Sequence, residues 1–575
     1  MAEDNLNEVI KRLYRFTNNI IKILITEPQI LFQMIIISGI FILFLILSYS
    51  LLFKKKPLRL YQFLFQKDKK LIIVVLMICI GISFLWDLYF FSFTKDDAYI
   101  TFRYAKNLAE GKGIVFNTRD NNPVEGYSNF LWVILSTIPH FLNLDVVLYT
   151  KIFSMILSVF TIIMLFKFAN LFYEKKWALI APLLYTLYYP FQLWTVGCLE
   201  TPLLVLLIIC VMYFAYKETV EKKLYPKLSV LFSILYSLAR IDGIIYIIGF
   251  EFSLIIYYLW LNKDKSLIVQ RLFSIAIISS IYSIYFLWRW NYYGYLLPNT
   301  FYTKRSKSLI SMAAIEYIAL FLIFSAPIIL LMIFGTYKTA IKNKDFKKLI
   351  FLIVPVIINF VITLNLKQFN AGQGFRYLLP GMPFIITISI DSFKHLKLNR
   401  KINFSEKFKL ISLFKHYCSI LFILSLVIIP TSAPLVHKNV INNDTNEKHY
   451  RLAKWFNKHI DKDELIAYVD MGVVPYYSEL DFVDMWGVVD EEVAHNGFSV
   501  EYILDREPTF IMFKIWGPSV DDFLEEEDFE ENYELFFTIE FKEIDQYLEE
   551  IEYDLEIYKL IDFDVSNNSL EEKFD

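Results

Sequence analysis

The sequence has little of what supports a small secreted domain or a nucleic-acid-binding protein. It contains only 4 cysteines in 575 residues, and their spacing fits neither a disulfide framework nor a zinc site. Charged residues make up only 20% of the chain and the net charge is -3, so there is no basic excess to bind nucleic-acid phosphates. We therefore expect no nucleic-acid partner.

Apolar residues are abundant instead. They form 56% of the chain, with 54 Phe and 38 Tyr, against about 45–50% in soluble domains. Apolar runs that are long enough, or nearly so, to cross a bilayer recur to about residue 430. The predicted spans are 31–53, 71–92, 147–171, 177–193, 201–217, 227–241, 244–260, 271–290, 311–337, 348–365, 377–393 and 411–430. The predicted fold is a polytopic α-helical membrane protein with about 11–12 transmembrane helices.

Lysine and arginine concentrate in alternate connections between these spans. The connections at 174–176, 221–223 and 342–348 are strongly basic, whereas those at 93–146 and 291–310 are less so. Basic connections remain in the cytoplasm. The sequence therefore predicts a multi-pass protein of the cytoplasmic (plasma) membrane, with its polar C-terminal part outside.

Changes in composition predict three regions. From about residue 433 the chain becomes polar, with a helix pattern followed by two strand patterns, which is typical of a small α/β domain. The regions are 1–70, an N-terminal amphipathic and accessory membrane helix region; 71–432, a transmembrane domain with an outer loop at 93–146; and 433–575, an extracytoplasmic α/β domain with an acidic tail. The helix is predicted at 447–459 and the strands at 465–469 and 481–485.

The outer loop begins with an amphipathic helix. Ala98, Phe102 and Ala105 share one helical face, Arg103 lies off that face, and Gly111 follows the helix. We expect this helix to lie along the membrane surface.

Asp96 and Asp97 stand side by side at the start of this helix. Carboxylates in this position commonly cap free N–H groups, which is worth about 1 kcal/mol, and spacing alone does not exclude that role. Alternatively, one of them is a general base, because two adjacent carboxylates next to a low dielectric repel each other and one pKa rises unless a cation offsets the charge. A raised pKa suits removal of a proton from a sugar hydroxyl. The pair could also hold a divalent cation such as Mg²⁺, Mn²⁺ or Ca²⁺, although nothing in the sequence requires a cofactor.

Further polar residues gather in other segments of the same predicted side. Each one alone fits a charge at a helix end or a long side chain reaching the bilayer surface. Together they favour convergence on one outward cavity, because ionisable groups at membrane depth are costly. The cations, which suit a lipid phosphate, are Arg240, Lys304, Arg305 and Arg376. The candidates for binding a sugar or an acceptor are Glu125, Tyr127, Asn129, Glu200, Asp242 and Asn299.

Two more candidates lie in the polar C-terminal region. Asp470 directly follows a predicted strand, where loops often carry function, although Asp and Gly after a strand are also ordinary turn residues. Tyr476 could stack on a sugar or belong to the core. We interpret this region as a lid or an acceptor-guiding domain beside the cavity.

Seven sequence blocks occur in a specific order between about residues 93 and 510. They read D-D-A-Y-I-T-F-R-Y-A-K-N-L, V-E-G-Y-S-N-F-L-W, G-C-L-E-T-P, A-R-I-D-G, Y-Y-G-Y-L-L-P-N-T-F-Y-T-K, F-R-Y-L-L-P-G-M-P-F and Y-V-D-M-G-V-V-P-Y-Y-S. In this order the blocks resemble the GT-C superfamily of polyprenyl-phosphate-dependent membrane glycosyltransferases, in particular the branch of the terminal β-arabinofuranosyltransferases. The chain departs from that branch at Ile241, where the family often has proline, and at Tyr295, where it often has aspartate.

The resemblance implies an inverting glycosyltransferase. A pentose or hexose would pass from a polyprenyl-phosphate donor to a cell-envelope glycan, glycolipid or protein acceptor on the outer face of the membrane, with Asp96 or Asp97 as the catalytic base. Membrane lipids would surround it.

Two alternatives remain at the level of sequence. A transporter or flippase for lipid-linked sugars would place polar residues on both sides of the membrane and show inverted repeats, and neither pattern is found. A non-catalytic envelope protein on a GT-C scaffold would have lost the acidic pair, which is present here.

Overall fold

The structure is a computed structural model that describes most of residues 68–565. Within that range the gaps are 120–122, 222–226, 305–309, 366–373, 394–432, 435, 438–444, 516 and 545–549, and a few residues between 11 and 34 are described as well. The predicted N-terminal region and the predicted spans 31–53 and 411–430 therefore lie almost entirely outside the described residues.

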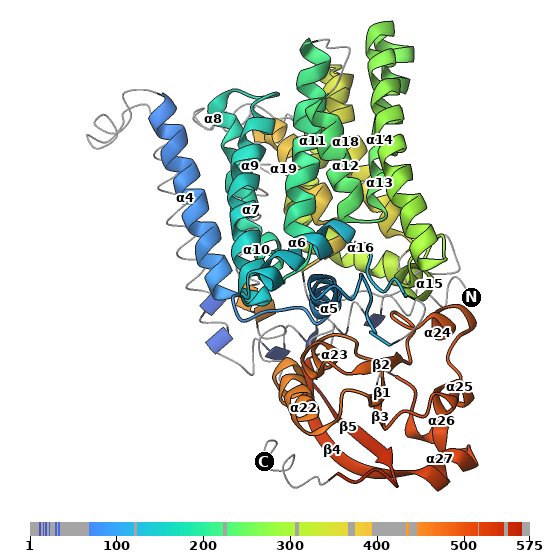
Figure 1. The fold of residues 1–575 in the computed structure, drawn as a ribbon. Helices are drawn as coiled ribbons and strands as arrows, with labels where there is room; N and C mark the ends of the chain where they lie inside the picture. Colours follow the sequence, from blue (N-terminus) through green and yellow to red (C-terminus); the bar gives the residue numbers. More distant parts are fainter. Residues whose placement is uncertain are drawn as a thin grey trace.

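Apolar helices form a bundle, with the C-terminal domain at one end of it (Figure 1). Among the described residues, six helices are long and apolar enough to cross a membrane, or seven if one bent pair counts as a single span. The six are α4 (Asp68–Tyr89), α7 (Val146–Ala169), α11 (Thr201–Glu221), α13 (Gly243–Tyr257, continued by the π-helix Tyr258–Asn262), α14 (Lys265–Tyr293) and α18 (Phe346–Thr363). The chain is a multi-pass membrane protein, as predicted.

The other predicted spans are short or broken helices. Span 177–193 is divided among α8 (Lys175–Ala178), α9 (Ile180–Leu187) and α10 (Pro190–Val196), and span 227–241 is the short α12 (Leu228–Ala239). Span 311–337 consists of α16 (Met312–Phe324) and α17 (Ala326–Tyr337), which meet at 86°. Span 377–393 begins as the 3-10 helix η4 (Arg376–Gly381) and continues as α19 (Met382–Phe393). Prolines at 190, 327 and 380 lie at these breaks, because proline supplies no N–H and disfavours the helical conformation before it.

The outer loop supplies the layer between the bundle and the C-terminal domain. It contains α5 (Asp97–Ala109) and α6 (Phe130–Phe141), and α15 (Asn299–Lys304) lies in the same layer (Figure 1). The predicted helix after residue 96 is present, and Gly111 and Gly113 follow it with φ of 78° and 95°. However, α5 is not an exposed surface helix, since even Arg103 is only 5% exposed.

The C-terminal domain is an α/β domain, as predicted. Its five-stranded sheet has the order β2-β1-β3-β5-β4, in which β1, β2 and β3 are parallel and β5 and β4 form an antiparallel hairpin. The strands are β1 (Leu465–Tyr468), β2 (Asp481–Asp484), β3 (Phe510–Phe513), β4 (Tyr533–Ile544) and β5 (Glu550–Leu560). The helices are α22 (Thr445–His459), α23 (Val473–Ser478), α24 (Glu491–Asn496), α25 (Val500–Asp505), α26 (Val520–Leu524) and α27 (Glu527–Asn532).

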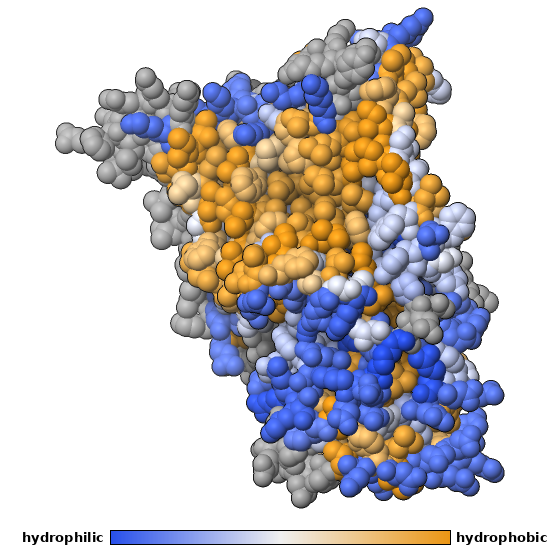
Figure 2. Space-filling view, in the orientation of Figure 1, coloured by the Kyte–Doolittle hydropathy of each residue, from blue (hydrophilic) through white to orange (hydrophobic). Residues whose placement is uncertain are grey.

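Helix α5 joins two hydrophobic cores. Tyr99 and Phe102 pack into the core of the helical bundle, whereas Tyr104 and Ala105 pack into the core of the C-terminal domain. Figure 2 shows a wide apolar surface over the bundle and a mainly polar surface over the C-terminal domain. The residues around α5 therefore lie where an apolar and an aqueous environment meet.

Candidate functional site

A cavity opens between the outer loop and the ends of the membrane helices. It encloses about 850 Å³ including its open mouth. Its lining comes from α5, the loop before α6, the segments after α10 and α12, helix α15 and helix η4. The lining residues are Asp97, Ile100, Thr101, Gly126, Tyr127, Ser128, Asn129, Leu199, Glu200, Arg240, Ile241, Asp242, Thr300, Phe301, Arg376 and Tyr377.

Seven predicted site residues share this cavity. They are Asp97, Tyr127, Asn129, Glu200, Arg240, Asp242 and Arg376. They come from five separate segments of the sequence, so the structure brings together groups that the sequence placed only on one predicted side.

Asp97 is the carboxylate of the acidic pair that lines the cavity. It is the first residue of α5, where the positive end of the helix dipole favours a negative charge. One of its oxygens, Oδ2, lies 3.9 Å from Nη2 of Arg376, and the side chain is 34% exposed. The cavity therefore has an accessible carboxylate directly beside a guanidinium.

A buried network of ion pairs forms the wall opposite. Arg240 Nε and Nη2 donate to the two oxygens of Asp242 at 2.9 and 3.1 Å, and Arg240 Nη1 donates to Glu200 at 3.1 Å. Glu200 also accepts a hydrogen bond of 3.0 Å from the amide of Asn129. Such charge-assisted, bidentate contacts fix the orientation of the guanidinium. The N–H of Ile241 donates to the carbonyl of Ser128 at 3.0 Å, which attaches this wall to the outer loop.

Arg376 is held by aromatic side chains. Its guanidinium lies 4.7 Å from the ring centre of Tyr377 and 5.2 Å from that of Trp194, and Nη2 donates to the Tyr377 hydroxyl at 2.8 Å. The preceding residue, Phe375, has a φ of 54°, a conformation that is costly for a bulky side chain. The backbone thus adopts a strained conformation at the point where it presents Arg376 to the cavity.

A second hollow of about 470 Å³ adjoins the first on the membrane side. The two share Glu200, Arg240, Asp242, Arg376 and Tyr377 in their linings. The remaining lining residues lie on or next to α11, α12, α13, α18 and η4 and include Leu204, Tyr236, Tyr246, Ile362 and Pro380. The inner hollow also has Thr201, Asn359 and Thr363 in its wall, so a ligand at the two arginines would meet polar and apolar side chains on both sides.

Asp96 lies in a different environment from Asp97. Its side chain does not cap α5; instead Oδ1 accepts a hydrogen bond of 3.0 Å from the N–H of Val473, at the start of α23. A Cβ atom on Gly472 would lie 2.1 Å from that oxygen, so a larger residue here would require the Asp96 carboxylate or α23 to move. Burial, and next the charge of Asp470, raise the pKa of Asp96 to about 7. The acidic pair is thus divided between the cavity and the contact with the C-terminal domain.

Asp470 follows β1 and belongs to a polar cluster at the carboxyl ends of the parallel strands. It accepts a hydrogen bond of 2.8 Å from Lys514, which follows the neighbouring strand β3 and also contacts Glu543 at 3.3 Å. Although burial alone would raise the pKa of Asp470, the ammonium of Lys514 lowers it. Asp470 therefore remains anionic near Asp96 but outside the cavity lining.

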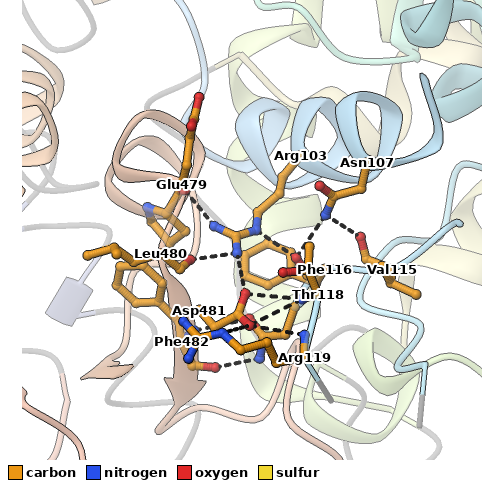
Figure 3. Close-up of polar contacts among 12 residues, drawn as sticks. Arg103, Asn107, Val115, Phe116, Thr118, Arg119, Glu479, Leu480, Asp481 and Phe482 are labelled. Carbon is orange, nitrogen blue, oxygen red and sulfur yellow. Dashed lines mark hydrogen bonds and ion pairs between the residues drawn. The ribbon is translucent and has the colours of Figure 1, made fainter. Parts of the chain in front are cut away.

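Arg103 holds the outer loop against the C-terminal domain (Figure 3). It donates to the carbonyl of Phe116 at 2.7 Å, to those of Pro475 and Leu480 at 2.5 and 2.6 Å, and to Asp481 at 3.1 Å. These partners lie on both sides of the contact between α5 and the C-terminal domain. The sequence suggested that the charge of Arg103 would face solvent. Instead, Arg103 is buried in the contact between the outer loop and the C-terminal domain.

The same contact between the outer loop and the C-terminal domain covers β2, the edge strand of the sheet. Asn117 exchanges hydrogen bonds of 2.8 and 3.0 Å with the backbone of Phe482 in β2, and the N–H groups of Thr118 and Arg119 donate to Asp481 (Figure 3). An edge strand otherwise exposes unpaired backbone groups. The outer loop therefore completes the sheet on this side.

Three other candidates lie outside the cavity lining. Glu125 forms an ion pair of 2.7 Å with the fully buried Arg289. Asn299 donates to the carbonyls of Gly487 and Asp490 at 3.3 and 3.0 Å. Tyr476 packs edge-on or tilted against aromatic rings of α5. Their contacts contribute to packing between the outer loop, α14 and the C-terminal domain.

Two predicted cations cannot be placed. Arg305 lies outside the described residues, and of Lys304 only the backbone, at the end of α15, is described. Within the described part of the chain, no group of three or more His, Cys, Asp or Glu side chains could hold a metal ion.

Sequence reasoning missed several lining residues and the main structural ion pairs. Tyr377 directly follows Arg376, and Thr101 follows Asp97 by one helical turn. Their places in the cavity lining could therefore have been predicted from the sequence. The role of Arg289 could not have been predicted in this way, because its partner Glu125 is 164 residues away in the sequence.

Comparison with solved structures identifies proteins of similar fold. Crystal structures of ArnT from Cupriavidus metallidurans are similar to this chain over almost their whole length. The apo structure has a TM-score of 0.54 at 11% identity and covers 85% of this chain and 98% of ArnT. The structure bound to undecaprenyl phosphate has a TM-score of 0.54 at 9% identity and covers 86% and 99%.

The archaeal oligosaccharyltransferase AglB from Archaeoglobus fulgidus, in complex with an inhibitory peptide and a dolichol-phosphate, is also similar. Its TM-score is 0.51 at 12% identity, and the match covers 77% of this chain and 69% of AglB. Residues 439–558 match a family model described as a domain of unknown function, DUF8728. No curated protein sequence matches the chain. The fold of this multi-pass protein is therefore the GT-C fold shared with ArnT, carrying a C-terminal α/β domain.

Proposed function

We propose that this protein is an inverting glycosyltransferase that moves a sugar from a polyprenyl-phosphate donor to an acceptor hydroxyl in the cavity described above. The observation that carries the proposal is the shared cavity of Asp97 and Arg376, whose charged groups are 3.9 Å apart. A carboxylate and a guanidinium at this separation supply the two groups that such a transfer needs. The GT-C fold, also found in structures of ArnT and AglB bound to lipid phosphates, supports it.

Arg376 and Arg240 bind the donor phosphate in this proposal. Both guanidinium groups line the two adjoining hollows, so a phosphate at their junction contacts both of them. When the bond between the sugar and the phosphate breaks, negative charge grows on the phosphate oxygens. Cations already fixed by Glu200, Asp242 and Tyr377 stabilise that charge without reorganising, and one such contact can be worth about 3 kcal/mol.

The polyprenyl tail extends into the inner hollow. This hollow lies among α11, α12, α13 and α18 and has Leu204, Ile362 and Pro380 in its wall. Apolar contacts along an isoprenoid chain are worth about 25 cal/mol per Å² that is removed from water. The sugar then occupies the outer cavity, where Glu200, Asp242 and Asn129 offer hydrogen-bonding groups.

Asp97 is the general base. The acceptor hydroxyl attacks the anomeric carbon from the face opposite the phosphate, Asp97 takes its proton, and the phosphate leaves with the bonding electrons. Attack from the opposite face inverts the anomeric configuration. Arg376 contacts Asp97 in the free protein. Binding of the donor phosphate draws that guanidinium toward the phosphate, and the weaker contact with Arg376 favours proton uptake by Asp97.

The donor sugar is a pentose or hexose, and the acceptor is an envelope glycan, glycolipid or protein. The ordered motif blocks of the sequence favour a terminal β-arabinofuranosyltransferase-like member of the GT-C group. The distribution of Lys and Arg supports a cavity and C-terminal domain outside the cytoplasmic membrane. No step of this mechanism uses a divalent cation at Asp96 and Asp97, because Asp96 contacts the C-terminal domain rather than the cavity.

Mass spectrometry of lipid-linked sugars tests the proposal. A strain that lacks the gene should accumulate one polyprenyl-phosphate sugar, and the wild-type gene should remove it. Asp97→Asn should not remove it, because loss of a general base typically lowers the rate by about 10²–10⁴-fold. Asp96→Asn is the matched control: it has the same chemical change at the adjacent position, and it should retain most activity.

The outcome that would exclude the proposed base is full activity of Asp97→Asn at a normal level of folded protein. The outcome that would exclude the proposed reaction is a gene deletion that leaves every lipid-linked sugar at its wild-type level.

A further inference from the structure

A set of buried polar side chains lies within the membrane helices, away from the cavity lining. Ser83 and Asp87 are on α4, Ser154 and Ser158 are on α7, and Gln192 is on α10. None of the five is more than 3% exposed. Burying a polar group this deep in a helical bundle costs free energy unless the group has a hydrogen-bonding or ionic partner. The contacts of these five residues therefore indicate their role.

The two serines in the middle of the set join the helices. The hydroxyls of Ser83 and Ser158 are 3.3 Å apart, and the amide nitrogen of Gln192 donates to the Ser83 hydroxyl at 3.3 Å. These contacts place α4, α7 and α10 side by side at one level of the bundle.

The other two residues lie one turn from this contact. Helix α4 runs toward the outer loop and α7 runs away from it (Figure 1). Moving from Ser83 to Asp87 and from Ser158 to Ser154 therefore shifts both positions in the same direction, by one helical turn of about 5.4 Å. Residues four apart share a helix face, so Asp87 and Ser154 lie at the same level of this interface, one turn from the contact of Gln192 with Ser83.

Three oxygen atoms here lack hydrogen-bond partners. They are Oδ1 of Asp87, Oγ of Ser154 and Oε1 of Gln192, each of them buried. Buried polar atoms are normally satisfied, and an unsatisfied group calls for an ion or water. A carboxylate, an amide oxygen and a hydroxyl all present oxygen lone pairs, which is the ligand chemistry of a hard cation.

The charge favours a monovalent ion. Asp87 is the only carboxylate of the set, and its Oδ1 has no hydrogen-bond partner among the described residues. One positive charge neutralises it. A divalent ion ordinarily requires more anionic ligands, and the described residues contain no cluster of three acidic, His or Cys side chains.

We propose that Asp87, Ser154 and Gln192 bind a monovalent metal cation of the sodium type between α4, α7 and α10. The cation supplies the missing partner for each of the three oxygens and holds the three helices together. Its role is structural and independent of the sugar transfer proposed above, because none of the three ligands lines the cavity.

Thermal unfolding of the purified full-length protein tests this proposal. The midpoint is measured in sodium chloride, potassium chloride and N-methyl-D-glucamine chloride at equal ionic strength, across a range of concentrations. Binding of sodium at about ten times its dissociation constant stabilises by about 1.4 kcal/mol, which should raise the midpoint by about 1–2 °C over that in N-methyl-D-glucamine. Asp87→Asn should remove the difference, and Ser154→Ala should raise the sodium concentration needed by about tenfold, as expected for loss of one ligand.

Asp145→Asn is the matched control. Asp145 is an exposed aspartate at the start of the same helix α7, where asparagine is also an effective cap. This variant changes the charge equally and should keep the sodium dependence. A stronger response to potassium than to sodium still supports a monovalent site with a different preference. Equal midpoints in all three salts would overturn the proposal and assign the space to water beside a protonated Asp87.

Discussion

At the scale of single residues, the two members of the acidic pair have different surroundings. Asp97 lines the cavity beside Arg376, whereas Asp96 contacts Val473 and the backbone of Gly472. The sequence could show that a carboxylate pair lies at the start of an outer helix. It could not assign their roles, because adjacent helical residues point about 100° apart and the side facing the cavity depends on where the C-terminal domain binds.

The raised pKa of Asp96 predicts a pH dependence. Because burial raises this pKa from 3.8 to about 7, the folded state binds the proton more tightly than the unfolded state does. The contribution of Asp96 to stability is therefore present in full below about pH 3.8 and is lost as the pH rises to about 7. Asp96→Asn should raise the unfolding midpoint at pH 8 and flatten its decline between pH 5 and pH 8, measured by thermal unfolding.

Asp145→Asn provides the control for that experiment, because Asp145 is exposed. A decline between pH 5 and pH 8 that is identical in wild type and Asp96→Asn would show that other groups cause it.

The pair Glu125–Arg289 predicts a stability effect without a direct catalytic one. Breaking a buried ion pair leaves an uncompensated charge and typically costs about 3–5 kcal/mol. Burial raises the pKa of Glu125 to about 7, so the measurement belongs at pH 8, where its carboxyl group is ionised. Glu125→Gln should strongly lower the denaturant midpoint. Glu110→Gln, which affects an exposed pair with Lys112, should change stability by less than about 0.5 kcal/mol. Equal effects would contradict the structural role of Glu125.

At the scale of secondary structure, the contact of α23 with α5 depends on the absence of a side chain at residue 472. A Cβ there would lie 2.1–2.2 Å from the carboxylate atoms of Asp96. Gly472→Ala should therefore push α23 away from α5 and destabilise the protein by about 1–3 kcal/mol. The separation can be measured as faster hydrogen exchange in residues 97–109 and 473–478.

A second substitution makes this prediction specific. Asp96→Ala removes the clashing atoms, so it should restore part of the stability lost in Gly472→Ala. Gly81→Ala is the control, since a Cβ on Gly81 meets nothing within 4 Å. Additive effects of Asp96→Ala and Gly472→Ala would show that the two residues do not interact.

Secondary structure was predictable where helices are continuous. Spans 147–171 and 348–365 correspond to α7 and α18 within a few residues. Spans 177–193 and 311–337 are also apolar but are broken or bent where proline interrupts them. In the C-terminal domain, β1 and β2 were evident from their apolar runs. The pairing of β3 with the β5–β4 hairpin was not, because it joins segments far apart in the sequence.

At the scale of the whole molecule, the polar cavity and the C-terminal domain lie at one end of the bundle (Figure 1). Helix α18 ends at the inner hollow with Ile362 and Thr363, so Lys344, which precedes its first residue, lies toward the other end. The prediction is that they face opposite sides of the membrane. With Cys418 replaced by serine, membrane-impermeant thiol labelling of intact cells should modify Lys112→Cys and Asp521→Cys. Lys344→Cys should react only after permeabilisation. All three positions are exposed, and Cys79, Cys198 and Cys210 are buried. The reverse pattern would invert the proposed topology.

The hydrogen bonds of Arg103 to the C-terminal domain also determine when the outer loop can adopt its folded conformation. Arg103 and its carboxylate partner Asp481 are 378 residues apart. At about 5–20 residues per second, a ribosome needs roughly 20–75 seconds to add the second after the first. During that interval α5 has neither its buried counter-charge nor the strand edge that its loop covers. The final position of α5, which carries Asp97 into the cavity wall, is thus fixed only after the C-terminal domain has been synthesised and folded.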